Sequence, residues 1–136
     1  MSIKFEGLEE LLDRLDKIDD EARVNEALGK CCAVVERAAK QLAPKDTGGL
    51  RGSITSRVEN KQGIIFTPLE YAPYVEFGTG LFAEAGGRLD VPWNYQDDEG
   101  NWVSTSGQKP QPFMRPALDQ SRQQIITILG RELAND

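Results

Sequence analysis

A glycine-rich segment, Gly48-Gly49-Leu50-Arg51-Gly52, is the first group of residues in this sequence that could do chemistry. A glycine-rich loop cradles a phosphate when it follows a strand, opens a helix and ends in Gly-Lys-Ser or Gly-Lys-Thr. This segment lacks that ending, and it follows a predicted helix and precedes a predicted strand. The pattern therefore argues against a nucleotide site. It predicts a tight turn with unusual backbone angles.

A run of acidic residues, Asp97-Asp98-Glu99, is the second such group, and its chemistry would be calcium binding. The three carboxylates are consecutive, whereas a twelve-residue calcium loop places its ligands at alternating positions. We therefore expect a solvated turn here.

Histidine is absent from the chain, and the only cysteines are Cys31 and Cys32. The commonest general base and transition-metal ligand is thus missing, which rules out Ser-His-Asp and Cys-His systems. Neighbouring helix positions point about 100° apart, so the two thiols cannot easily bond to each other. We expect small core residues, with an intermolecular link or a reactive thiol as the alternative. The sequence predicts no catalytic residue, no metal site and no cofactor, and hence no enzyme.

The whole composition predicts one folded domain. The chain has 136 residues, of which 39% are hydrophobic and 28% charged, which is typical of a packed domain. No apolar run approaches the roughly 20 residues that cross a bilayer. The first residues, 1–6, carry no signal-peptide core. We expect a protein kept in a cytoplasm or built into a particle assembled there, with no membrane partner.

The net charge of −6 argues against broad DNA binding, which needs a basic face. It suits a soluble subunit, or one that lines a channel through which DNA slides. A local basic patch remains open, because Lys40, Lys45 and Arg51 lie close together in the sequence.

The elements that would position these residues form an α+β fold. Apolar residues recur at three- and four-residue spacing over residues 7–18, and again over residues 20–42 with Asp19-Asp20 as a plausible N-cap. Pro44 would end the second helix. A third helix is predicted near the C-terminus, with Pro116 in its first turn.

Between the long helix and the C-terminal helix the pattern changes to strands. Residues 54–59 and 63–67 read as a hairpin around residues 60–63, which must pack on the long helix or join a larger sheet. Residues 81–110 are polar and read as a protruding hairpin around residues 97–100. Trp93 and Trp102 would flank that turn and could pair across the strands.

Aromatic residues gather between these two hairpins, at Tyr71, Tyr74 and Phe77, and glycines follow them. Two interpretations stay open. The aromatic rings could complete the core over the first hairpin, or they could form a protein–protein interface.

Three segments of the sequence together resemble the gp-ten-like tail-component family of long-tailed phages and prophages. They are residues 43–54 (APKDTGGLRGSI), 71–79 (YAPYVEFGT) and 111–118 (QPFMRPAL). They occur in the family's order and span the chain from end to end. Each segment alone is a weak signal, whereas three together with flanking helices are a strong one.

The resemblance implies a structural virion protein that forms a ring at the head–tail junction, a tail-completion or head–tail joining subunit with no catalytic residues. Its partners would be further copies of itself and other neck and tail proteins, with no specific nucleic acid. We interpret its glycines as turn formers, its aromatics as core, and its charged residues as ion-pair partners. The signature positions are Thr47, Gly48, Leu50, Arg51, Ser53, Ile54, Tyr71, Tyr74, Val75, Glu76, Phe77, Gly78, Thr79, Pro112, Phe113, Arg115 and Pro116.

Two alternatives to a neck ring stay open at this stage. One is a tail terminator or minor capsid protein of the same virion. The other is a small DNA-binding regulatory module that uses the basic residues between Lys40 and Arg51.

Overall fold

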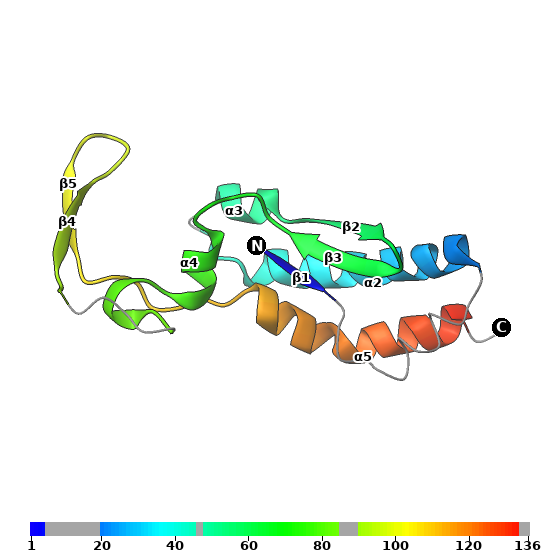
Figure 1. Cartoon of the computed structure of the whole chain (residues 1–136). Helices are drawn as coiled ribbons and strands as arrows, with labels where there is room; N and C mark the ends of the chain where they lie inside the picture. The colour runs from blue at the N-terminus through cyan, green and yellow to red at the C-terminus, as the bar shows by residue number, and fades with distance from the viewer. Residues whose placement is uncertain (5–19, 46–47, 85–89, 134–136) are drawn as a thin grey trace. The chain divides into compact units, whose positions relative to one another are not determined.

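The computed structural model describes residues 1–4, 20–45, 48–84 and 90–133 (Figure 1). This part of the chain is α+β, as predicted, with helices, a three-stranded sheet and a two-stranded sheet. It divides into two compact units, the first made of residues 1–69 with 113–136 and the second of residues 70–112. The helix predicted over residues 7–18 lies outside the described residues.

The long helix α2 (Glu21–Leu42) confirms the helix predicted over residues 20–42. The Asp20 carboxylate accepts a hydrogen bond from the backbone N–H of Arg23 at 3.1 Å, as an N-cap does. One face of the helix is buried along its whole length. The buried residues are Val24, Ala27, Leu28, Cys31, Cys32, Val35 and Ala39.

The C-terminal helix α5 (Met114–Leu133) runs antiparallel to α2 and begins two residues before Pro116. The Arg23 guanidinium, near the start of α2, donates through Nε and Nη2 to the backbone oxygen of Glu132 at 3.2 and 2.9 Å. Lys30 Nζ lies 2.8 Å from the Glu132 carboxylate, and this hydrogen bond lowers the pKa of Glu132. The α5 residues that complete the core are Met114, Ala117, Ser121, Ile125 and Leu129.

The first sheet has the strand order β1-β3-β2 and is antiparallel throughout. Strands β2 (Thr55–Glu59) and β3 (Gln62–Phe66) form the predicted hairpin, with a two-residue turn in which Asn60 and Lys61 have φ angles of 51° and 58°. Positive φ at both turn residues matches the twist of the flanking strands. Strand β1 (Ser2–Lys4), which the sequence analysis missed, pairs with β3.

The hairpin packs against α2, as expected of a two-stranded unit that is not stable alone. The Cys32 sulfur lies 3.8 Å from the backbone oxygen of Arg57 in β2. From β3, Ile64 and Ile65 are buried. The core of the first unit therefore lies between α2, α5 and the sheet.

The glycine-rich segment forms a short helix, α3 (Gly48–Ser53), so the predicted tight turn with unusual angles is wrong. Gly52 does not have a positive φ angle. Leu50 and Ile54 are four residues apart and both are fully buried, and a helical turn places such a pair on one face. Burial of this pair outweighs the modest cost of glycine in a helix.

The second hairpin, β4 (Trp93–Gln96) and β5 (Trp102–Thr105), is confirmed. The predicted pairing of its tryptophans is wrong, because Trp93 lies opposite Thr105 and Trp102 opposite Gln96. The turn sets this register, since the N–H of Asp97 donates to the Asn101 oxygen at 2.9 Å. No helix in the described residues has the length and apolar character needed to cross a membrane.

Replacing Gly29 by alanine should stabilise the protein. Gly29 lies inside α2, and a Cβ added there would meet no atom within 4 Å. Glycine in a helix interior costs roughly 0.5–1 kcal/mol relative to alanine, so the free energy of unfolding in urea should rise by about that amount. Gly130→Ala in α5 is the matched case, with the same open surroundings. Lower stability of both variants would contradict this view of the two helices.

Candidate assembly surface

The first signature segment joins three elements of the first unit. The Ser53 hydroxyl donates to the Leu50 oxygen at 2.7 Å and lies 2.6 Å from the hydroxyl of Thr67, just after β3. The Arg51 guanidinium donates through Nη2 to the Ala43 oxygen at the end of α2, at 3.3 Å. With Leu50 and Ile54 in the core, this part of the signature has a structural role.

Thr47, the first signature residue, lies outside the described residues, and Gly48 begins α3. The third segment anchors α5: Phe113 is fully buried, whereas Arg115 is exposed and Pro116 is half-buried in the first helical turn. Pro112, at the end of the second unit, is exposed.

The second unit is built around a short helix, α4 (Ala72–Phe77), and a 3₁₀ turn, η1 (Gly80–Phe82). Residues 106–111 return alongside this segment. The N–H of Thr79 donates to the Gln108 oxygen, and the Thr79 hydroxyl accepts from the Gln108 N–H, both at 2.9 Å. The N–H of Gln111 donates to the Val75 oxygen at 2.8 Å. These hydrogen bonds therefore tie residues 108–111 to α4 at Val75 and to Thr79, just beyond the C-terminal end of α4.

Two glycines allow these segments to approach closely. Gly78 and Gly80 have φ angles of 83° and 60°, which L side chains rarely adopt. A Cβ on Gly80 would lie 2.7 Å from the Trp93 ring, and one on Gly78 would lie 2.9 Å from Pro110 Cδ. The predicted turn-forming role of the signature glycine Gly78 is confirmed, and close packing adds to it.

Aromatic and large aliphatic side chains are exposed throughout this second unit. Tyr74 is 61% exposed and Trp102 is 72% exposed. Large exposed hydrophobic residues in the described part of the chain all fall between residues 70 and 112. They are Tyr71, Tyr74, Phe77, Leu81, Phe82, Tyr95 and Trp102.

The expectation that the signature aromatics fill the core is therefore wrong for Tyr71, Tyr74 and Phe77, and it holds for Phe113. The physical reason is that α4 has only six residues, and its fully buried members are Ala72 and Glu76. The opposite side of so short a helix stays in water. Exposed apolar residues gathered in one unit are typical of an interaction surface.

The charged signature residues have different surroundings. Glu76 is fully buried in the second unit, and Arg115 is exposed on α5. Arg51 hydrogen-bonds a backbone oxygen. Ion pairing among these three residues stays a prediction.

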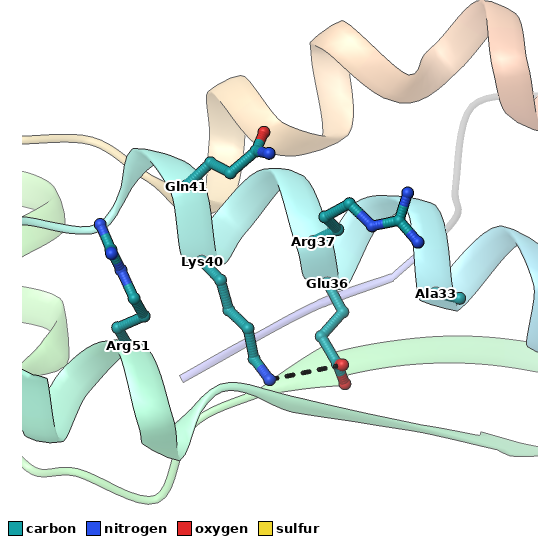
Figure 2. A pocket seen from close by; sticks show the side chains of 6 residues that line it. All are labelled: Ala33, Glu36, Arg37, Lys40, Gln41 and Arg51. Carbon is teal, nitrogen blue, oxygen red and sulfur yellow. Dashed lines mark ion pairs between the residues drawn. The ribbon is translucent and has the colours of Figure 1, made fainter.

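A groove of about 370 Å³ lies on the first unit, between α2 and α3 (Figure 2). Lys40 Nζ lies 3.6 Å from the Glu36 carboxylate, and Arg51 approaches α2 from α3. The basic residues Lys40 and Arg51 thus share a surface, as their sequence positions suggested, whereas Lys45 is not part of it. The lining residues are Ala33, Glu36, Arg37, Lys40, Gln41 and Arg51.

Neither cysteine is placed for reaction. Cys31 and Cys32 are both buried with free thiols, which supports the interpretation as core residues. Burial raises the pKa of the Cys31 thiol to about 12 and that of Cys32 to about 11. Among the described residues, no cluster of three or more His, Cys, Asp or Glu side chains could hold a metal ion.

Comparison with known proteins finds a matching family. A family model described as "Bacteriophage HK97-gp10, putative tail-component" matches residues 8–78, slightly more than half of the chain. This range contains the first signature segment and the second except Thr79, and the third segment lies beyond it. No curated protein and no solved structure matches the chain.

The two thiols should resist alkylation in the folded protein. The thiolate fraction falls about tenfold for each unit of pKa, and burial raises the Cys32 pKa from 9.0 to about 11. At pH 8, iodoacetamide should therefore react roughly 100-fold more slowly with the folded chain than with the chain in denaturant. Equal rates, followed by mass spectrometry, would show that the thiols are accessible.

The same pKa shifts predict a loss of stability in alkali. The folded pKa values lie above the unfolded value of 9.0, so the folded state holds the two protons more tightly. This contribution is fully present below about pH 9 and is lost as the pH rises towards 11 to 12. A Cys31→Ala, Cys32→Ala variant should lose less unfolding free energy than the natural chain between pH 9 and 11. Identical losses would contradict the assignment.

Proposed function

Since this chain belongs to the HK97-gp10 family of bacteriophage tail components, we propose that it forms a ring at the head–tail junction and joins the tail to the DNA-filled head. Family membership makes it a tail component and a virion protein. Ring formation, the place in the neck and the joining role are our proposal.

The exposed aromatic surface of residues 70–112 is the observation that carries this proposal. Interfaces between proteins are enriched in Tyr, Trp and Phe at their buried centres. Exposing so many large apolar side chains on one unit is unfavourable in water and becomes favourable when another subunit covers them. A subunit of a larger particle has such a covering partner, whereas an isolated soluble protein does not.

The hydrogen bonds and close packing that order this surface also favour assembly. The hydrogen bonds of Thr79 and Gln108 and the close packing at Gly80 fix α4, η1 and the base of the hairpin to one another. A surface ordered before binding loses less conformational entropy on binding. Closed rings of identical subunits need head-to-tail contacts between two different faces, and the polar groove of the first unit differs from the exposed aromatic side chains of the second unit.

Deletion of the gene is the direct test of the joining role. Lysates that lack this protein should contain filled heads and finished tails that are not attached to each other, seen by electron microscopy. Supplying the protein from a plasmid should restore joined particles. Normal infectious particles without the protein would contradict the proposal. A label located at the tail tip or on the capsid would point to the alternatives of tail terminator or minor capsid protein.

Truncating the most exposed aromatics should impair assembly without unfolding the protein. Removal of an interface hot spot costs about 2 kcal/mol or more, which is a roughly 30-fold loss of affinity. A Tyr74→Ser, Trp102→Ser variant should therefore restore few joined particles in the deletion background. Its melting temperature should stay close to that of the natural chain, because both side chains are mostly in water.

The matched control is Asn94→Ala, an exposed polar residue on the same hairpin as Trp102. It should complement the deletion as the natural gene does. Full complementation by the aromatic variant would show that this surface is not used in assembly.

A further inference from the structure

The groove between α2 and α3 is basic, whereas the chain as a whole carries a negative net charge. Its walls carry Arg37, Lys40 and Arg51 against the single carboxylate of Glu36, whereas the whole chain has a net charge of −6. Its volume of about 370 Å³ lies in the range of roughly 300–1,000 Å³ found for pockets that bind small groups. The groove therefore suits acidic groups.

The donors in the groove are only partly satisfied within the chain. Lys40 faces Glu36 at 3.6 Å, but the exposed guanidinium of Arg37 has no ion-pair partner in the described residues. Arg51 uses Nη2 for the Ala43 oxygen, while its buried Nε has no acceptor among them. A guanidinium donates along a fixed fork that suits a carboxylate. The arrangement thus leaves room and donors for incoming carboxylates.

The tip of the β4–β5 hairpin offers such carboxylates. Asp97 is used within the turn, since its Oδ1 accepts from the N–H groups of Glu99 at 3.0 Å and Asn101 at 2.8 Å. Gly100 has a φ angle of 84° and donates to the Asp97 oxygen. Asp98 and Glu99 are exposed, and within the described part of the chain their carboxylates have no partner. A well-ordered turn therefore presents two adjacent free carboxylates.

In the other run of three acidic residues, at 19–21, the two described residues stabilise the start of α2. Asp20 caps α2 through the N–H of Arg23, and Glu21 lies in the first turn, where a negative charge stabilises the helix. Among the described residues of the two runs, Asp98 and Glu99 are thus the ones whose carboxylates have no local role.

We propose that the acidic tip of the β4–β5 hairpin, Asp98 and Glu99, binds in the basic groove of Arg37, Lys40 and Arg51 on a second copy of this chain. This contact gives the ring of the proposed function its head-to-tail direction and rests on that function for its biological role. The tip and the groove are different surfaces, and a contact between two different surfaces repeats from copy to copy. Trp102 and Tyr95 on the same hairpin add apolar area beside the ionic contact.

A second copy fits the groove better than DNA does. Binding to the DNA backbone depends on neutralising several phosphates with a broad basic face. This groove is one small concavity that contains Glu36, in a chain of net charge −6. Arg37, Lys40 and Arg51 against Glu36 leave two net positive charges in the groove, which the two carboxylates on the turn would balance.

Disulfide trapping between two differently substituted chains tests the contact. A Glu99→Cys chain mixed with an Arg37→Cys chain under mild oxidation should give a cross-linked heterodimer on a non-reducing gel. The natural Cys31 and Cys32 do not interfere, because both are buried. The control pair, Asn94→Cys with Arg37→Cys, places the new thiol on the same hairpin away from the tip. Trapping no greater than that of the control pair would overturn the proposal.

Charge reversal gives an independent test by sedimentation at low salt. An Asp98→Lys, Glu99→Lys chain and an Arg37→Glu, Lys40→Glu chain should each associate at least tenfold more weakly with itself than the natural chain does. Their mixture should recover association, and added salt should weaken it. Circular dichroism checks that both variants are folded, and Arg37→Glu alone serves if the double variant is not. Failure of the mixture to recover association would overturn the contact.

Two other outcomes would also overturn the proposed contact between the hairpin tip and the groove. One is a disulfide that forms within a single chain carrying both Glu99→Cys and Arg37→Cys but not between mixed chains, because the tip would then lie in its own groove. The other is retention of duplex DNA that Arg37→Glu, Lys40→Glu abolishes. Failure here is distinguishable from failure of the proposed function, since head–tail joining is read from particles and this contact from purified chains.

Discussion

The buried face of α2 is the constraint on which the first unit depends. Its small and branched side chains, from Val24 to Ala39, contact α5 on one side and the β2–β3 hairpin on the other. Because neither a two-stranded hairpin nor an isolated helix is stable alone in water, each element needs this face. The polar contacts of Arg23 and Lys30 with Glu132 then align the helix ends. The first signature segment contacts the opposite end of α2 through the Arg51 guanidinium, and Ser53 links the same segment to Thr67 after β3.

The second unit is stabilised in a different way from the first. It has a few short elements, held by backbone hydrogen bonds around Thr79 and by glycines that let chain segments touch. Such a unit has little interior, so several of its large apolar side chains are exposed, Tyr74 and Trp102 most of all. Under the proposed function, a neighbouring subunit would cover these residues.

The polar groups of this protein have no arrangement that indicates catalysis among the described residues. Its thiols are buried and protonated, its capping carboxylates hold helix and turn ends, and its basic groove is open and shared with a carboxylate. The capping carboxylates thus stabilise local structure, and the groove is the site that we propose for a second copy. This agrees with membership of a family of tail components.

Periodicity in the sequence alone was enough to identify α2, α5 and the first hairpin, because the 3.6- and 2-residue repeats of side chains are local properties. The second hairpin was identified by the turn-forming residues at 97–100. The motifs of residues 43–54 and 71–79 likewise identified the family. Strand β1 was missed because three residues carry no periodic signal, and only its pairing with β3 defines it. The helical form of residues 48–53, the register that separates Trp93 from Trp102, and the exposure of Tyr71 and Tyr74 depended on contacts distant in sequence. Only the tertiary structure decided those, because what surrounds a side chain is not a local property.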